Sequence, residues 1–310
     1  MNTTSSSPLQ STSRHSISRH STGERALVLG GGGSTGNAWL IGVLAGLSDA
    51  GLDVTTADLT IGTSAGSTAA AQIAGASPTE LFAAVLTGVP PRPAGPAGRP
   101  NRPVADHMDR MNRTIAAAVD AADMRRRMGA AALDRDAAAD GSWQSQWRAT
   151  VASRLPDRHW PHRRLLITAV DAATGEPVVF DSASGVDLVD AVAASCASGL
   201  PYRIGDGRYI DGGYRSNAEN ADLAAGYARV LVLSPFGGRS LHPVEWGTHL
   251  AAQVDELRAC GSRVETIFPD GDSEHLFGTA AMDPSLRPPA ARAGYDQGGA
   301  LAERLTEFWR

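Results

Sequence analysis

The stretch ALVLGGGGSTGNAWLIGVL, residues 26–44, decides the fold expected for this chain. Its apolar start, residues 26–29, is typical of a short buried strand, and residues 37–51 have the apolar spacing of a helix that ends near Gly51. Between them lie the four consecutive glycines 30–33. A glycine loop at a helix N-terminus can bring several backbone N–H groups to one anion. The stretch therefore predicts an anion cradle, either for a nucleotide phosphate or for the oxyanion of an ester under attack.

Strands and helices are expected to alternate along the rest of the chain. The strand 58–62 is followed at once by a helix over 65–76, and the helix 77–88 begins with Ser77 as N-cap and Glu80 three residues later. Further strands are expected within 164–170, 177–181, 202–214, 229–236 and 263–269, and further helices over 186–198, 244–261 and 290–309. This alternation predicts a three-layer α/β/α fold with a mostly parallel central sheet.

The chain is expected to form one domain over residues 25–310, after a disordered leader at 1–24. Its 310 residues with 42% hydrophobic content suffice for a large core. The leader is rich in Ser, Thr, Arg and His and has no apolar run, so it is not a secretory signal. Residues 89–160 read as an insertion or lid, because they open with a Pro/Gly/Arg-rich stretch and continue as an Ala- and Arg-rich helical region.

Within that insertion, Met108, Met111, Ile115 and Val119 recur at helical spacing. The expected structure is a helix with one apolar face packed on the core. A mobile lid that touches lipid is the alternative.

Composition narrows the functional classes. The formal net charge of −5 and a pI near 5.9 give no electrostatic reason to expect nucleic acid. The two cysteines, Cys196 and Cys260, make neither a disulfide framework nor a metal site, and fit a reducing compartment. No stretch approaches the ~18 apolar residues of a membrane span. We therefore expect a cytoplasmic protein with no metal and no cofactor, which can still visit a membrane surface.

The glycine loop has two phosphate-binding interpretations. A P-loop needs a lysine after its last glycine, and this chain contains no lysine at all. A dinucleotide-binding loop fits better, since Gly31, Gly33 and Gly36 match G-x-G-x-x-G and Asp53 lies about 20 residues beyond. In that fold, however, the acid should end the second strand, whereas Asp53 precedes it. A non-catalytic Rossmann-like nucleotide binder stays as an alternative.

The second expected strand ends in GTSAG, residues 62–66, which matches G-x-S-x-G between a strand and a helix. This is the setting of a nucleophile elbow, where the serine occupies a sharp turn with small neighbours. Acyl transfer also requires hydrogen-bond donors for the oxyanion. The backbone N–H groups of the preceding glycine loop can supply them, which assigns this role to Gly31, Gly32, Gly33 and Ser34.

A serine hydroxyl needs a base before it can act as a nucleophile. Downstream histidines are available for a Ser–Asp–His triad, namely His242, His249 and His275, although none lies in a segment of catalytic character. The alternative base is Asp211, in the Asp-Gly-Gly run 211–213 after a short strand. Residues alone leave a triad esterase and a direct carboxylate base both open.

Three motifs, in this order, resemble the patatin-like phospholipase family: GGGSTG (31–36), GTSAG (62–66) and DGG (211–213). The resemblance extends over nearly all of residues 26–236 and includes AASCASGLPY (193–202). It implies a Ser–Asp dyad without histidine, with Ser64 as nucleophile and Asp211 as general base.

The resemblance also implies an acyl ester of a lipid as substrate, of the phospholipase A or lysophospholipase type, and transient contact with a membrane or lipid aggregate. It points to no protein partner. The glycines expected to support the motifs are Gly36, Gly62, Gly66, Gly212 and Gly213. One position departs from the family pattern, because Thr35 stands where an arginine is common. Backbone donors survive this change, but a guanidinium near the loop is missing from the motif.

Overall fold

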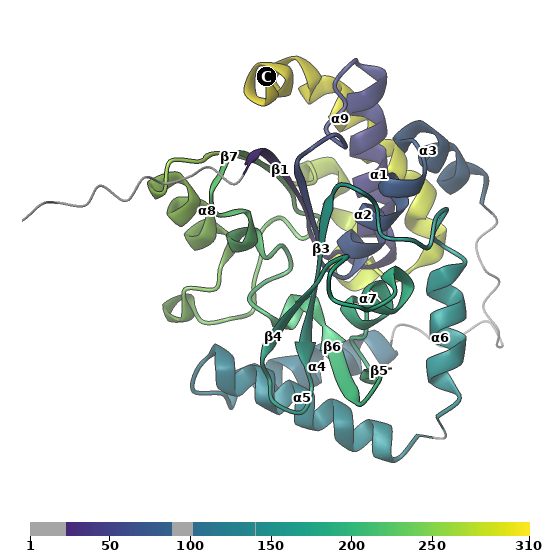
Figure 1. Cartoon of the computed structure of the whole chain (residues 1–310), viewed down its shortest axis with the longest axis vertical. Helices are drawn as coiled ribbons and strands as arrows, with labels where there is room; N and C mark the ends of the chain where they lie inside the picture. The colour runs from purple at the N-terminus through teal and green to yellow at the C-terminus, as the bar shows by residue number, and fades with distance from the viewer. Residues whose placement is uncertain (1–22, 89–101, 140) are drawn as a thin grey trace, which may run out of the picture.

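The computed structural model describes residues 23–88, 102–139 and 141–310. The expected leader (1–24) lies outside this part except for its last two residues, and so does the first part of the insertion, 89–101. An eight-stranded sheet runs through the centre in the order β5-β6-β3-β2-β1-β7-β8, with β4 also pairing with β3 (Figure 1). The strands are β1 (Gly23–Leu29), β2 (Leu59–Gly62), β3 (Arg164–Asp171), β4 (Pro177–Phe180), β5 (Tyr202–Ile204), β6 (Gly207–Asp211), β7 (Tyr227–Leu233) and β8 (Arg263–Ile267).

The centre of the sheet is parallel, as expected. Strands β3, β2, β1, β7 and β8 run in one direction, while β4, β5 and β6 form antiparallel pairs at one end. The helices are α1 (Gly33–Asp49), α2 (Ala65–Gly75), α3 (Pro78–Thr87), α4 (Arg102–Ala116), α5 (Ala121–Ala137), α6 (Trp143–Ala152), α7 (Leu188–Ser195), α8 (Leu250–Ala259) and α9 (Arg287–Trp309). None of these described helices is both long and apolar enough to cross a bilayer.

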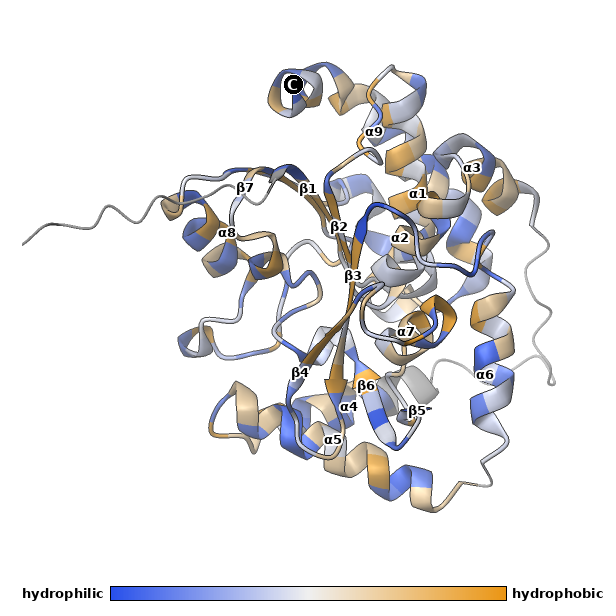
Figure 2. Cartoon of the chain, in the orientation of Figure 1, coloured by the Kyte–Doolittle hydropathy of each residue, from blue (hydrophilic) through white to orange (hydrophobic). Residues whose placement is uncertain are grey.

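Alternate residues of β1 face two different hydrophobic layers. Leu27 and Leu29 belong to the larger core cluster, which includes residues of α1, α2, α7 and α9. Ala26 and Val28 belong to a second cluster on the other face, with residues of α8. Because strand side chains alternate between faces, a strand that is apolar throughout must be covered on both sides. The central strands are correspondingly apolar in Figure 2, and the three-layer α/β/α prediction is confirmed.

Helices α1 and α9 pack closely because glycines line their contact. A Cβ at Gly42 or Gly46 of α1 would collide with backbone carbonyls of α9. The reverse holds for Gly294 and Gly298 of α9, whose Cβ positions would meet the carbonyls of Trp39 and Val43. This contact fixes the start of α9 against the start of α1, which is also the end of the glycine loop.

Several local expectations can be compared with the structure. Helix α3 has the predicted capping box, since Ser77 accepts from the N–H of Glu80 and the Glu80 side chain accepts from the N–H of Ser77. The helix expected over 244–261 is wrong at its start. Residues 244–246 form a 3₁₀ turn that ends at Gly247 with φ +65°, and α8 begins only at Leu250.

The apolar face expected in the insertion is shorter than its sequence pattern. Ile115 is buried against α5, but α4 ends at Ala116 and Val119 is 80% exposed beyond it. The apolar spacing in the sequence therefore continues beyond the end of α4, and Val119 is not part of the packed face.

The α1–α9 contact provides a test of the fold. Gly298→Ala should lower the free energy of unfolding by roughly 1–3 kcal/mol, since the new methyl group meets fixed backbone. The adjacent Gly299 has open space at its Cβ position, so Gly299→Ala should leave stability unchanged or raise it by up to ~1 kcal/mol. Urea denaturation of both variants checks this. Equal effects at the two positions would contradict the packing described.

Candidate active site

Ser64 lies on the turn between β2 and α2 in a strained backbone conformation. Its φ is +52° and its ψ is −118°, a region that non-glycine residues rarely adopt. The turn is tight, because a Cβ at Gly66 would collide with the carbonyl oxygen of Leu29 and a Cβ at Gly62 would lie 2.6 Å from the Cα of Ser67. The turn thus has the geometry of a nucleophile elbow, with the Ser64 hydroxyl projecting from it.

The end of α7 holds the backbone of Ser64 in place. The Ser64 N–H donates to the hydroxyl of Ser195 at 2.9 Å, and the thiol of Cys196 donates to the Ser64 carbonyl at 3.1 Å. Both residues belong to the AASCASGLPY segment. This segment therefore stabilises the turn by side-chain contacts that a motif pattern does not show.

Asp211 accepts a hydrogen bond from Ser64. Its Oδ2 lies 2.8 Å from the Ser64 Oγ. Strand β3 brings the two together, because Gly62 pairs with Ile167 and Asp211 pairs with Ala169, two residues further along. The two residues predicted as a dyad, 147 positions apart in the chain, are therefore in direct contact.

The Asp211 carboxyl is almost fully buried, at 8% exposure. Burial raises its pKa to about 6, while hydrogen bonds from the Gly213 N–H and from Ser64 oppose the rise. No cation contributes to this balance. A carboxylate with a pKa near 6 is a far better proton acceptor at neutral pH than an ordinary aspartate.

Asn220 links the nucleophile turn to the acid turn. Its side-chain amide donates to the Thr63 Oγ1 and to the Gly212 carbonyl, both at 3.0 Å. Thr63 also contacts the hydroxyl of Thr168 on β3 at 2.9 Å. Asn220 itself has a left-handed backbone, with φ +56°. Sequence reasoning missed this buried network, and its only signal was an asparagine in a polar loop.

The glycine loop lies directly beside Ser64. A Cβ built at Gly31 would be 3.5 Å from the Cβ of Ser64. The Gly31 N–H, however, donates to the Ala218 carbonyl at 2.7 Å. Of the four donors expected here, Gly31 is therefore engaged in holding the loop. In the described part of the chain, the N–H groups of Gly32, Gly33 and Ser34 have no acceptor.

These three N–H groups begin α1, where a helix leaves its first donors unpaired. Gly33 adopts φ +64°, which a side chain would strain, and Gly36 donates from its N–H to the carbonyl of Gly32. The helix N-terminus adds a partial positive charge at the same place. The loop can therefore accommodate an oxyanion beside the serine hydroxyl.

Thr35 points into the protein and not toward the site. It is fully buried, and its hydroxyl has no hydrogen-bond partner among the described residues. A guanidinium nevertheless reaches this loop from α9, because Arg287 donates to the Ser34 carbonyl at 2.8 Å and to the Asn37 side chain at 3.1 Å. Sequence reasoning missed Arg287, which lies about 250 residues from the loop.

The histidines lie apart from this pair. His242 contacts the Thr248 hydroxyl, His249 contacts the His242 carbonyl, and His275 contacts the Asp272 carbonyl. The hydrogen bonds of the Ser64 side chain and the Asp211 carboxylate in the described structure involve no histidine.

The carboxylate of Asp53 accepts from Thr55 within its own turn before β2. Among the described residues no cluster of three or more His, Cys, Asp or Glu side chains could hold a metal ion.

Comparisons with known proteins identify a family for this chain. The family model described as patatin-like phospholipase matches residues 27–222. A search of curated proteins finds no significant match. Among solved structures, VipD from Legionella pneumophila aligns at 14% identity and a TM-score of 0.42, over 92% of this chain and 67% of VipD.

The type III effector ExoU aligns at 14% identity and a TM-score of 0.39, over 91% of this chain and 53% of ExoU. A complex of SpcU with ExoU from Pseudomonas aeruginosa aligns at 17% identity and a TM-score of 0.37, over 93% of this chain and 53% of that chain. This chain thus spans about half the length of ExoU.

The buried Asp211 carboxyl should reduce stability at neutral pH. Because its folded pKa lies above that of an unfolded aspartate, the native state binds more protons between pH 4 and about 6, so its contribution to stability falls across that window. Asp211→Asn should remove this fall. The free energy of unfolding of the variant minus that of wild type should therefore be up to ~3 kcal/mol larger at pH 8 than at pH 4. Urea denaturation at the two pH values measures this.

The exposed Asp206→Asn provides the matched control and should behave as wild type at both pH values. Burial raises the pKa of Glu219 to about 7, so Glu219 also lowers stability as the pH rises. This contribution is the same in wild type and in both variants and cancels in the comparison. An Asp211→Asn variant that is less stable at pH 8 than at pH 4, relative to wild type, would contradict the burial argument.

Proposed function

Since the chain belongs to the patatin-like phospholipase family, we propose that it is a serine acyl hydrolase that works through a dyad of Ser64 and Asp211. Family membership supports lipid acyl hydrolysis as the general activity. The observation that carries the dyad is the 2.8 Å hydrogen bond between the Ser64 hydroxyl and a buried carboxylate whose pKa is raised to about 6. The carboxylate contacts the serine hydroxyl directly, with no histidine between them.

In the proposed first step, Asp211 accepts the Ser64 proton as the Oγ attacks the ester carbonyl. Charge then develops on the carbonyl oxygen, which the N–H groups of Gly32, Gly33 and Ser34 stabilise. One such donor typically lowers the barrier by ~3 kcal/mol. Collapse of the tetrahedral intermediate expels the alcohol, which takes the proton from Asp211, and leaves an acyl group on Ser64.

The second step repeats the first with water as the nucleophile. Asp211 accepts a proton from a water molecule, the hydroxide attacks the acyl carbonyl, and Ser64 leaves with the proton returned to it. We propose a phospholipase A or lysophospholipase reaction, on lipid presented by a membrane or aggregate. The described part of the insertion, residues 102–139 and 141–160, would then act as a lid, and no cofactor enters either step.

Two alternatives yield different results. A Ser–Asp–His esterase would lose turnover in His242→Ala or His275→Ala, whereas the dyad would not. A nucleotide binder would show a saturable rise in melting temperature with NAD or NADP. The direct contact between Ser64 and Asp211 favours the dyad over both.

Labelling with a fluorophosphonate tests the nucleophile. Mass spectrometry should find the adduct on Ser64, and Ser64→Ala should lose labelling and at least ~10³-fold of ester hydrolysis. Asp211→Asn should be comparably slow while staying folded. Ser67→Ala, whose hydroxyl contacts the Ser64 carbonyl at 2.6 Å, serves as a neighbouring serine control that should still be labelled at Ser64. A folded wild-type protein without an adduct on Ser64 would refute the proposal.

The pH profile tests the base. Asp211 must be ionised to accept a proton, so kcat/KM for an uncharged ester should rise about tenfold per pH unit below about 6 and level off above it. Glu219 titrates near the same range, with a pKa of about 7, but does not touch Ser64. The rising limb should therefore survive in Glu219→Gln. Loss of the rising limb in Glu219→Gln would instead assign the titration to Glu219 and contradict the role of Asp211 as the base.

Arg287 should position the oxyanion donors from outside the motif. Arg287→Gln should lower kcat on the order of 10- to 100-fold with little change in KM, because the Ser34 carbonyl loses its anchor and the neighbouring N–H groups shift. Arg287→Lys should recover part of this loss. Arg292→Gln, an exposed arginine on the same helix, is the control expected to match wild type. A change in KM alone would instead place Arg287 in substrate binding.

A further inference from the structure

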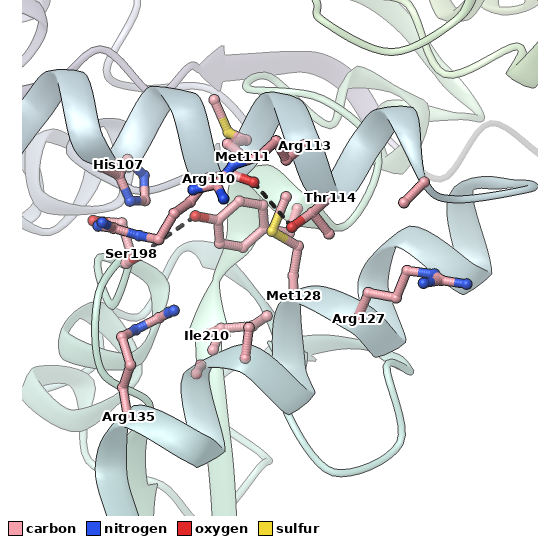
Figure 3. A pocket seen from close by; sticks show the side chains of 14 residues that line it. His107, Arg110, Met111, Arg113, Thr114, Arg127, Met128, Arg135, Ser198 and Ile210 are labelled. Carbon is pink, nitrogen blue, oxygen red and sulfur yellow. Dashed lines mark hydrogen bonds between the residues drawn. The ribbon is translucent and has the colours of Figure 1, made fainter. Parts of the chain in front are cut away.

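A second feature beside the dyad is a cavity of about 380 Å³ between α4, α5 and the end of β6 (Figure 3). Its lining includes the cationic side chains of Arg110, Arg113, Arg127 and Arg135, together with His107. None of the described residues that line it is acidic. A cavity with several guanidinium groups and no carboxylate in its wall is complementary to an anion.

Most of these cations lack a carboxylate partner. Among the described side chains, Arg127 pairs with Asp123 at 2.7 Å, whereas Arg110, Arg113 and Arg135 form no ion pair. Arg135 is held instead by the Gly199 carbonyl, to which its Nη2 donates at 2.8 Å. The Arg135 Nε donates to the same carbonyl at 3.2 Å, so that Nη1 is the nitrogen without an acceptor among the described residues and is available to a ligand.

Three of these side chains gather at one end of the cavity, while Arg113 and Arg127 lie away from them (Figure 3). Figure 3 shows His107 and Arg110 reaching from α4, and Arg135 reaching from α5, toward the same space beside Ser198. Burial, then the charges of Arg110 and Arg135, lower the pKa of His107. Burial and Arg110 also lower the pKa of Arg135. Like charges held this close repel each other, and a bound anion would relieve that repulsion.

The cavity borders the turn that follows Asp211. Ile210 and Tyr214 of its lining flank the Asp211-Gly-Gly turn on either side. The Tyr214 hydroxyl donates to the Ser198 carbonyl at 3.4 Å, and the residue before Ser198 accepts the Asp211 N–H. A ligand here would therefore lie beside the turn that carries Asp211.

The remaining lining is apolar and includes Met111, Met128 and Ala132. An anion with adjoining hydrocarbon fits this combination better than a small inorganic ion does. We infer that the cavity binds the phosphate group of a phospholipid substrate through Arg110, Arg135 and His107, and thereby selects lipids with anionic headgroups. This inference rests on the proposed hydrolase function and names its substrate class.

The expected selectivity follows from charge. The phosphate group carries one negative charge in both lipids, but phosphatidylglycerol is a net anion, whereas the quaternary ammonium of phosphatidylcholine cancels that charge and would lie near the arginines. Soluble dihexanoyl lipids allow the comparison without a membrane surface. Wild type should prefer dihexanoylphosphatidylglycerol over the phosphatidylcholine, and p-nitrophenyl hexanoate serves as the uncharged reference ester.

Arg110→Gln is the principal test, because the Arg110 side chain forms no hydrogen bond within the described structure. The ratio of kcat/KM for phosphatidylglycerol to kcat/KM for the uncharged ester should fall about tenfold or more. Arg135→Gln should reduce the same ratio. Arg126→Gln, an exposed arginine on α5 outside the cavity lining, should keep the wild-type ratio. Melting temperatures verify that each variant is folded.

A binding measurement separates this inference from the hydrolase function. Titration calorimetry on Ser64→Ala should show saturable binding of dihexanoylphosphatidylglycerol that Arg110→Gln weakens about tenfold. Unchanged lipid binding, or equal loss on charged and uncharged esters, would overturn the inference while leaving the dyad intact. Inorganic phosphate that binds as tightly as the lipid would overturn the lipid assignment and identify a free-phosphate site. Absence of ester hydrolysis in wild type would refute the proposed hydrolase function, while the calorimetry would still show whether the cavity binds the anionic lipid.

Discussion

The hydrogen bond between Ser64 and Asp211 imposes most of what is unusual in this structure. For a carboxylate to take the proton of a serine directly, it must be close to the hydroxyl and must not be strongly solvated. Both conditions act against folding. The serine occupies a backbone conformation that costs about 1–3 kcal/mol, and the carboxyl is buried without a cation. The surrounding structure has to offset both.

The offset comes from rigid elements on either side of the pair. The glycine-lined contact of α1 with α9 fixes the glycine loop, and the end of α7 fixes the Ser64 backbone from the other side. Asn220 joins the two turns, so that neither can move without breaking a buried hydrogen bond. The strain is therefore distributed over contacts that lie away from the reacting atoms.

The sequence could predict the parts of this arrangement whose constraint is local. A strand, a small-residue turn and a helix produce a nucleophile elbow within a few residues, so Ser64 is recognisable from GTSAG. The same holds for the layer order, since Leu27 and Ala26 alternate between two covered faces. The parallel sheet was predictable because strands and helices alternate along the chain.

What the sequence could not show depends on contacts between distant segments. Arg287 reaches Ser34 only because α9 packs on α1, and no pattern near residue 35 announces it. The engagement of Gly31 with Ala218 has the same origin. Thr35 departs from the family motif, but Arg287 of α9, near the other end of the chain, brings a guanidinium to the same loop. The predicted end of the helix in the insertion was wrong for a related reason. The apolar spacing continues to Val119 and does not reveal that α4 ends at Ala116.

The placement of cations reflects a further constraint that the dyad imposes. An arginine beside Asp211 would favour the ionised carboxylate and lower its pKa, which would make it a weak base. The structure keeps such charges away, since none contributes to the pKa of Asp211. Tyr214 lies between the two regions and is influenced by Asp211 on one side and by Arg110 and Arg135 on the other. Under the proposed function, the arginines would therefore attract an anionic lipid without lowering the basicity of Asp211.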